Sequence, residues 1–144
     1  MRIELKKSKR IIIKIGSSIV NSPNDTDYIS SICDEVSAQI SHGKEIILVT
    51  SGAISKGMSV INITDRPKDI KKLQALAALG QQKLMMMYEK LFSNNNNKTA
   101  QILITHNDIN NRVSYLNIKG TLEELIDNNI IPIINENDVV STEE

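Results

Sequence analysis

Three short apolar runs, each followed at once by small or polar residues, constrain the fold of this chain more than any other feature. The runs are IIIKI at 11–15, IILV at 46–49 and IIPII at 130–134, and they lead into GSS, TSGA and NEND. Continuous apolar runs are typical of strands buried on both faces of a parallel sheet. Ligands bind at the carboxyl ends of such strands. The pattern therefore predicts an α/β fold and the edge of the sheet at which a site should lie.

Composition limits the class of protein. A chain of 144 residues suits one domain, and its formal net charge of zero gives no basic surface for nucleic acid. The apolar runs are far too short to span a membrane. The single cysteine, Cys33, cannot form an internal disulfide, which suits a reducing compartment. We therefore expect a cytoplasmic protein with neither a nucleic-acid nor a membrane partner.

Strand and helix signals alternate along the chain. Helical periodicity predicts apolar stripes on the expected helices. Gly80 lies inside the apolar stripe of the helix expected over residues 68–92. Glycine weakens a helix by ~1 kcal/mol relative to Ala, so we expect a close backbone approach at this position. The alternation predicts right-handed crossovers, a parallel sheet and helices on both of its faces. The expected strands are Arg10–Ile15, Glu45–Thr50, 99–105 and 130–134. The expected helices are Asp25–Ser41, with Tyr28, Ile32, Val36 and Ile40 inward; 68–92, with Leu73, Leu76, Gly80, Leu84, Met87 and Leu91 inward; and 115–128, with Ile118, Leu122, Leu125 and Ile126 inward.

Lys14 and the TSGA segment are candidate anion-binding elements. A lysine in a buried strand is unfavourable unless it emerges at the strand end and meets an anion, or lies at a sheet edge and reaches solvent. The segment 50–53 offers hydroxyls and free backbone amides, although an ordinary strand-to-helix turn has the same composition. Neither glycine segment has the spacing of a P-loop or of a dinucleotide fingerprint, which disfavours both classes of site.

The polar segment NEND at 135–138 follows a buried strand directly. Its side chains could accept from an ammonium group, donate to a carboxylate or orient a metal-bound water, and a turn rich in Asx residues is an equally good interpretation. His106 is interpreted as a loop residue, because no second His or Cys stands at metal-ligand spacing.

Taken together, the segments KIGSS at 14–18, VTSGAI at 49–54 and PIINEND at 132–138 resemble the amino-acid kinase family. LQALAALGQ at 73–81 and the segment 112–122 narrow the resemblance to the glutamate 5-kinase branch, over residues 11–142. The resemblance implies the family's parallel-sheet αβα sandwich, truncated to its N-terminal half. Residues 1–144 would form the glutamate-binding part, with the ATP-binding half and a C-terminal RNA-binding-type domain absent.

The resemblance also implies a reaction, the ATP-dependent phosphorylation of the glutamate side-chain carboxylate in proline biosynthesis. Carboxylate and phosphate repel each other, so cations and amide donors are needed between them. Mg²⁺ would accompany the ATP, and no protein side chain is expected to ligate a metal. By the same resemblance, Lys14 would be catalytic and bind phosphate; Gly16 and Ser17 would bind the phosphate of ATP; and Ser51, Gly52, Asn135 and Asp138 would bind glutamate, with Asp138 facing its ammonium group.

Three readings of the function stay open. In the first, the chain is part of a glutamate 5-kinase that is completed by a second polypeptide or by further sequence. In the second, it is a non-catalytic relic or a module that binds glutamate or proline. In the third, it is an interaction protein that pairs with a full-length kinase. A doubly wound sheet cut midway exposes the edge of a strand, which favours self-association. We therefore expect the isolated chain to be marginally stable or a homo-oligomer.

Overall fold

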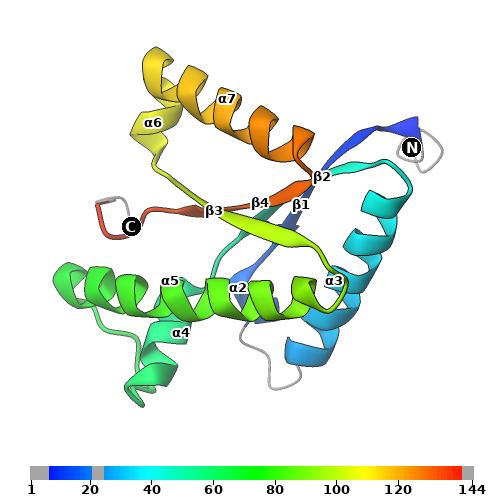
Figure 1. The fold of residues 1–144 in the computed structure, drawn as a ribbon. Coiled ribbons are helices and arrows are strands. Elements are labelled where there is room, and N and C mark those ends of the chain that lie inside the picture. The colour runs from blue at the N-terminus through cyan, green and yellow to red at the C-terminus, as the bar shows by residue number, and fades with distance from the viewer. Residues whose placement is uncertain (1–6, 21–24, 141–144) are drawn as a thin grey trace.

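The computed structural model describes residues 7–20 and 25–140, in which strands and helices alternate (Figure 1). The strands are β1 (Arg10–Ile15), β2 (Glu45–Thr50), β3 (Lys98–Ile104) and β4 (Ile130–Glu136). The helices are α2 (Ser17–Val20), α3 (Asp25–Ser41), α4 (Ala53–Val60), α5 (Ile70–Ser93), α6 (His106–Asn110) and α7 (Arg112–Asp127).

The strands form one parallel sheet in the order β1-β2-β4-β3. β1 pairs with β2 from Arg10 opposite Glu45 to Ile15 opposite Thr50. β3 pairs with β4 from Lys98 opposite Ile130 onward. Parallel neighbours cannot be joined by a tight turn, so each crossover carries a helix. This arrangement confirms the α/β class and the parallel sheet.

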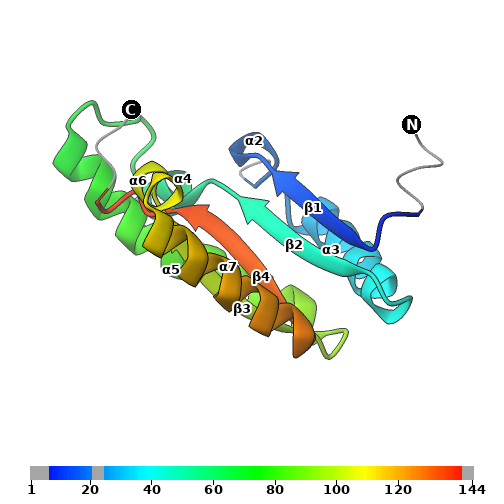
Figure 2. The same ribbon diagram turned by 90° about the horizontal axis from the view of Figure 1, so that it is seen from above.

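Helices lie on both faces of the sheet, but they cover the two faces unequally. α3 and α5 pack on one face, with α4 beside α5, and α7 lies on the other (Figure 1). Figure 2, seen from the α7 side, shows α7 over β4 and β3, with β1 and β2 uncovered by any described helix. Ile12 of β1 is accordingly 65% exposed.

The main core is mostly aliphatic, with two aromatic side chains, and lies between the sheet and the helices α3 and α5. Tyr88 and Phe92 of α5 are its largest side chains, and both are fully buried. Cys33 is also buried there as a small packing residue and is not in a disulfide. Other members of this core are Ile15, Ile29, Val36, Ile46, Leu48, Leu84, Ile131 and Ile133.

A close crossing of α4 and α5 confirms the expectation for Gly80. A Cβ atom at Gly80 would lie 1.8 Å from the carbonyl oxygen of Ala53. A Cβ atom at Gly57, on the facing helix, would lie 2.0 Å from the carbonyl oxygen of Leu76. The two glycines therefore let the helix backbones touch, and a second apolar cluster of Ile54, Leu73, Leu76 and Ala77 fills the space beside them.

The expected inward stripe of α3 is wrong at Tyr28, which is 58% exposed. Val36 is buried as expected, but its buried partners on the helix are Ile29 and Cys33. An α-helix has 3.6 residues per turn, so strict four-residue spacing drifts around the axis by about 40° at each step. Steps of four and three residues, as from Ile29 to Cys33 to Val36, stay on one face. In α5 the expected stripe steps by three residues from Leu84 to Met87, which is only half-buried, whereas the step of four residues reaches Tyr88, which is the core residue.

Three short helices, α2, α4 and α6, were not expected, because a helix of four to eight residues shows too little periodicity to be recognised. The boundaries of the longer helices follow their caps. α5 begins at Ile70 because the carboxylate of Asp69 accepts from the Lys72 N–H. α7 begins at Arg112, three residues before the expected start, because Asn111 caps it by accepting from the amides of Val113 and Ser114. The four residues expected to face inward from α7 are half-buried against the sheet.

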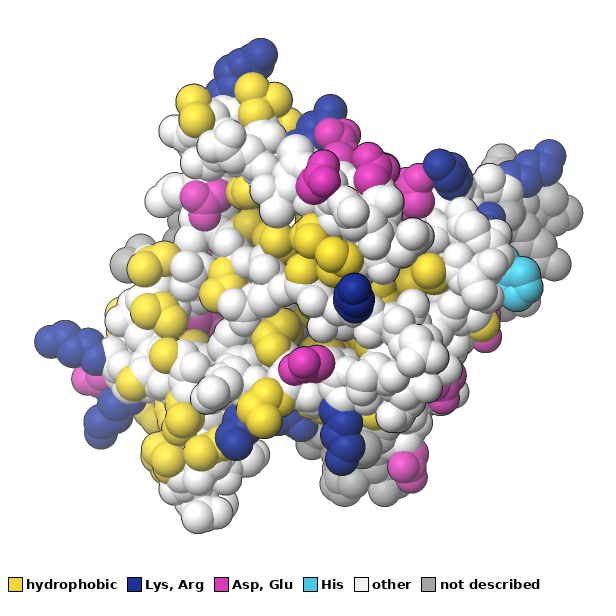
Figure 3. Space-filling model, viewed as in Figure 1, with side chains coloured by type: hydrophobic (Ala, Val, Ile, Leu, Met, Phe, Trp, Pro, Cys, Tyr) yellow, Lys and Arg dark blue, Asp and Glu magenta, His cyan; other side chains and the backbone are white. Residues whose placement is uncertain are grey.

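Figure 3 shows charged side chains mainly around the outline of one face, with apolar side chains between α7 and α5, where β3 crosses. β3 and β1 are the outer strands, each paired on one side only within the described residues. No helix in the described ranges, 7–20 and 25–140, combines the length and the apolar character needed to cross a bilayer.

Candidate active site at the carboxyl ends of the strands

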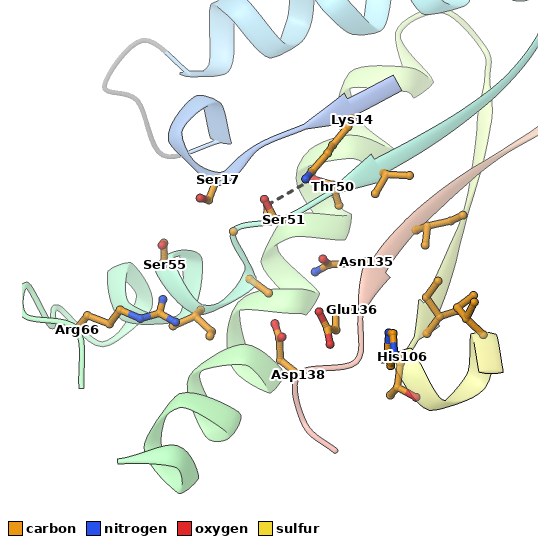
Figure 4. Close-up of a pocket in the computed structure, with 18 residues that line it drawn as sticks. Lys14, Ser17, Thr50, Ser51, Ser55, Arg66, His106, Asn135, Glu136 and Asp138 are labelled. Carbon is orange, nitrogen blue, oxygen red and sulfur yellow. Dashed lines mark hydrogen bonds between the residues drawn. The ribbon is translucent and has the colours of Figure 1, made fainter. Parts of the chain in front are cut away.

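A cavity of about 610 Å³ opens at the carboxyl edge of the sheet, the edge at which the apolar runs predicted a site. It is lined by the ends of β1, β2 and β4, by the residues after β3 and by the first turn of α4 (Figure 4). Its polar lining residues are Lys14, Ser17, Thr50, Ser51, Gly52, Ser55, Arg66, Thr105, His106, Asn135, Glu136 and Asp138.

Lys14 supplies a positive charge to one side of the cavity. It is the penultimate residue of β1, and the strand alternation turns it to the same face as Ile12, where no described helix covers it. Its side chain is exposed and points toward Thr50 and Ser51 (Figure 4). Because the lysine emerges where the strand ends, its ammonium group reaches the cavity without burial of the charge.

A buried hydrogen bond holds the end of β2 against the core. The Thr50 side chain lies 2.8 Å (Oγ1 to OH) from the hydroxyl of Tyr88, and Thr50 is only 5% exposed. Burial raises the pKa of Tyr88 to about 12, so this phenol stays neutral across the physiological range. The hydrogen bond therefore ties the first residue of the TSGA segment to α5.

Gly52 converts the end of β2 into the start of α4. Its φ of 103° lies in the left-handed region, which glycine adopts without a steric penalty. Gly52 occupies the N-cap of α4 and makes no side-chain cap, so the first-turn amides of Ala53, Ile54 and Ser55 keep their N–H groups for another acceptor. All three residues line the cavity, and the positive end of the helix dipole favours an anion there.

Asn135 lies opposite, on β4, and is 5% exposed. β4 runs to Glu136, two residues beyond its expected end, so Asn135 and Glu136 belong to the strand and not to a turn. The Asn135 Nδ2 donates to Gln81 Oε1 at 2.8 Å, and Gln81 Nε2 donates to Gln101 Oε1 at 2.9 Å. Three amides from β4, α5 and β3 thus form one hydrogen-bonded chain that ends at the cavity.

The chain after β4 is held in place by β3. The backbone N–H of Asn137 donates to the carbonyl of Ile104 at 2.8 Å. This contact directs Glu136 and Asp138 along the rim of the cavity, on the same side as Asn135 (Figure 4). The β4 side of the cavity therefore carries carboxylate and amide oxygens.

The interpretation of His106 as a loop residue is wrong, because the residue lies in a helix, and it also lines the cavity. It is the first residue of α6, which is capped by reciprocal hydrogen bonds between Thr105 and Asp108. The Thr105 hydroxyl and backbone N–H both donate to the Asp108 carboxylate, which lowers the pKa of that carboxyl. The capping box thereby fixes the start of α6 beside the cavity.

Most of the residues singled out in the sequence lie around this one cavity: Lys14, Ser17, Ser51, Gly52, Asn135 and Asp138. Gly16 does not line it. A Cβ atom there would meet nothing closer than Ser18 Oγ at 4.0 Å, so the packing does not require glycine at this position.

Arg66 and His106 line the cavity and were not expected to. His106 follows a strand end, and the rule that placed the other residues would have found it. Arg66 lies between α4 and α5, and no local pattern in the sequence marks it.

A resident metal site is not formed by the described part of the chain, in which no three His, Cys, Asp or Glu side chains are grouped to hold an ion. Glu136 and Asp138 are nevertheless two carboxylates at one rim. Mg²⁺ usually takes one or two carboxylates together with phosphate oxygens and water. The donor set thus fits a magnesium ion delivered with a phosphate ligand, and not one held by protein alone.

The charges divide the cavity into two sides. Donors gather at β1 and β2, where Lys14 and the first turn of α4 lie, and acceptors gather at β4, where Asn135, Glu136 and Asp138 lie. A ligand that carries an anionic group at one end and a cationic group at the other would match this arrangement.

Comparisons with known proteins agree with this geometry. The model of the Amino acid kinase family matches residues 9–144. The Glutamate 5-kinase of Burkholderia thailandensis is 44% identical over 147 aligned positions, and that of Azoarcus sp. (strain BH72) is 42% identical over 147. Each alignment covers all of this chain but only 40% of the relative, so the chain spans about two fifths of the length of these relatives.

Solved structures share the fold at low identity. A carbamate kinase from Giardia superposes with a TM-score of 0.57 at 14% identity, over 90% of this chain and 58% of that one. A carbamate kinase from Giardia lamblia bound to AMP-PNP superposes with a TM-score of 0.55 at 15% identity, over 91% of this chain and 57% of that one.

Proposed function

Because the chain belongs to the amino acid kinase family, we propose that its cavity binds glutamate and that the chain supplies the glutamate-binding part of a glutamate 5-kinase. The observation that carries the proposal is the convergence of Lys14, Ser51, Gly52, Asn135 and Asp138 on one cavity. The identity of 42–44% to the two glutamate 5-kinases, over the whole of this chain, supports the choice of substrate.

In the proposed pose the two ends of glutamate meet opposite sides of the cavity. The ammonium group lies toward Asp138 and Asn135, and the side-chain carboxylate lies toward Lys14 and the amides at the start of α4. Ser51 donates its hydroxyl to the bound amino acid. The pose follows from charge complementarity, because acceptors line the β4 side and donors the β1 and β2 side.

The reaction then needs little covalent help from the protein. An oxygen of the glutamate side-chain carboxylate attacks the terminal phosphorus of ATP, the bond to the bridging oxygen breaks, and an acyl phosphate and ADP result. Lys14 stabilises the negative charge that accumulates between the two anions, with further donation from backbone N–H groups near Ser17 and Gly52. Mg²⁺, where bound, would neutralise phosphate charge, and Glu136 and Asp138 are carboxylates that line the cavity and could hold it.

We propose that most contacts to ATP come from a further segment, on the same or on a second polypeptide. The first argument is length, because the chain spans 40% of the two glutamate 5-kinases. The second is the exposed side of Lys14, where β1 has no described helix over it.

The cytoplasm is the compartment that we propose for the protein, since its single cysteine, Cys33, is buried and not in a disulfide.

Two measurements on the purified chain test this function. Calorimetric titration with L-glutamate should show binding, and Asp138→Asn should weaken it by roughly tenfold through loss of a charged hydrogen bond. Release of ADP in the presence of ATP, Mg²⁺ and glutamate then reports whether the nucleotide also reacts.

The matched control for the lysine is Lys83, which is exposed on α5 and lies outside the cavity. Any glutamate-dependent ADP release should be abolished in Lys14→Ala and unchanged in Lys83→Ala. Binding of glutamate without ADP release would favour a binding module or a part that needs its complement. Absence of glutamate binding would contradict the proposed function.

A further inference from the structure

We infer that Gln81 is a positioning residue that turns the oxygen of the Asn135 carboxamide toward the cavity and so selects ligands with a hydrogen-bond donor at that point. The inference rests on the proposed function, which it deepens by naming the ligand class. That class is the α-amino dicarboxylates, as opposed to dicarboxylates without an amino group.

The contacts come from three elements that are distant in the sequence. Gln81 lies on α5, half-buried, and its Oε1 accepts from Asn135 Nδ2 at 2.8 Å. Its own Nε2 donates to Oε1 of Gln101, an exposed residue of β3, at 2.9 Å. Gln81 does not line the cavity and so acts on a ligand only through Asn135.

The hydrogen bond decides which end of the Asn135 amide faces the ligand. A carboxamide has a donor nitrogen and an acceptor oxygen of nearly equal size, and rotation by 180° exchanges them. With Nδ2 committed to Gln81, Oδ1 is the end left to face the cavity. Rotation of Asn135 alone would set its oxygen against the oxygen of Gln81, and an unpaired polar group is unfavourable at a residue that is 5% exposed.

Of the three hydrogen-bonded amides, that of Gln101 is held least firmly, because it lies at the exposed end of the row. If Gln81 turned as well, its oxygen would face the oxygen of Gln101, and only a third rotation would restore both hydrogen bonds. Gln101 is exposed and can make that rotation with water as an alternative partner. Gln81 therefore couples the orientation of Asn135 to its own, so that Asn135 cannot rotate unless Gln81 rotates with it. The contact with Gln101 contributes less, because water can replace it.

An inward-facing Oδ1 agrees with the charge on this side of the cavity. Asp138 and Glu136 also present oxygens there, whereas the donors lie across the cavity at Lys14 and the start of α4 (Figure 4). An ammonium group is attracted to the carboxylates and can donate to Oδ1. A ligand that carries only carboxylates would place nothing there that can donate to Oδ1.

The test compares L-glutamate with glutarate, which lacks the ammonium group, by calorimetric titration of the full 144-residue chain. In the unchanged chain glutamate should bind at least about tenfold more tightly than glutarate. Gln81→Met keeps the length of the side chain but loses the acceptor, and it should reduce that ratio to roughly threefold or less. Gln81→Glu keeps an acceptor for Asn135 Nδ2 and should preserve the ratio.

Gln101→Ala is a milder variant that perturbs only an exposed residue. It should lower the ratio by less than Gln81→Met does, because Gln81 keeps its contact with Asn135. Equal weakening of both ligands by Gln81→Met, with an unchanged ratio, would mean that Gln81 only supports the fold, and the inference would be wrong.

A measurement without ligand separates this inference from the proposed function. Exchange of the Asn135 side-chain amide protons, followed by NMR, should be slow in the unchanged chain and in Gln81→Glu, and fast in Gln81→Met. Failure of glutamate to bind while this pattern holds would contradict the proposed function alone. Fast exchange in the unchanged chain would overturn the inference, whatever binds.

Discussion

At the scale of single residues, Tyr88 links the core to the candidate site. Its ring is fully buried and its hydroxyl is hydrogen-bonded to Thr50, the residue at which β2 ends. The side chain therefore does two things: it fills the space between α5 and the sheet, and it sets the position from which Ser51 and Gly52 enter the cavity.

Removal of that hydroxyl should destabilise the chain. Tyr88→Phe leaves the Thr50 hydroxyl without its partner in the core, so we expect the free energy of unfolding to fall by about 1 kcal/mol. Tyr115→Phe is the matched control, since Tyr115 is 49% exposed, and it should change stability little. Urea titration followed by circular dichroism measures both. Equal effects of the two substitutions would contradict the assigned role of the hydrogen bond.

Stability should also fall at alkaline pH. Burial raises the pKa of Tyr88 to about 12 and that of Cys33 to about 12, the latter also through the nearby Asp34. In the unfolded chain a tyrosine ionises near pH ~10 and a cysteine near pH ~8.5. The unfolded state thus loses these protons first, so stability present below those values is lost as the pH rises toward 12.

Urea titrations at pH 8 and pH 11 should reveal this loss. The difference in unfolding free energy between the two pH values should be smaller in Tyr88→Phe and in Cys33→Ala than in the unchanged chain. A difference that neither substitution reduces would show that other groups cause the alkaline destabilisation.

At the scale of elements, the crossing of α4 and α5 positions one wall of the cavity. α4 starts at the cavity and rests directly on α5 through Gly57 and Gly80, where an added Cβ would collide with backbone atoms. A backbone cannot yield as a flexible side chain does. The direction in which the first turn of α4 presents its amides therefore depends on the absence of side chains at these two positions.

Gly80→Ala should destabilise the chain by about 1–3 kcal/mol, because overpacking outweighs the gain in helix propensity. Gly120→Ala is the matched control, also inside a helix but with nothing within 4 Å of the added Cβ. It should leave stability unchanged or raise it by up to about 1 kcal/mol. Thermal and urea unfolding compare the two variants, and a neutral Gly80→Ala would contradict the close crossing.

At the scale of the whole molecule, the open face of β1 is the main irregularity, because Ile12 is 65% exposed whereas its neighbour Ile47 on β2 is buried. The same face is covered by α7 over β4 and β3, but no described helix lies over β1 (Figure 2). An outer strand with an exposed apolar side chain can pair with another strand edge. The exposed strand is next to the candidate site, because β1 also carries Lys14.

We therefore predict self-association through β1. In sedimentation velocity runs over a concentration series, the sedimentation coefficient should rise with concentration, and Ile12→Thr should reduce that rise. Val113→Thr, on α7, is the control because Val113 is exposed to the same degree, 68% against 65% for Ile12. A monodisperse monomer, or an effect of Val113→Thr alone, would contradict association through this strand.

The sequence determined the strands, their parallel arrangement and the edge of the sheet at which the cavity lies. These properties depend on local pattern: the apolar runs of β2 and β4 are largely buried on both faces, although that of β1 is buried on one face only. The residues after the runs must emerge together where parallel strands end. For the same reason Lys14, Ser51 and Asn135 could be assigned to one place without any knowledge of distances.

The tertiary structure decided how helices and distant side chains meet. It placed Ile29 and not Tyr28 in the core, left β1 without any of the described helices over one face, brought Arg66 from a connection into the cavity and joined Gln81 to Asn135 across 54 residues of sequence. None of these is encoded in a local pattern, because each depends on the rotation of a helix about its axis and on the point at which two elements cross. Those quantities are fixed only when all side chains pack together.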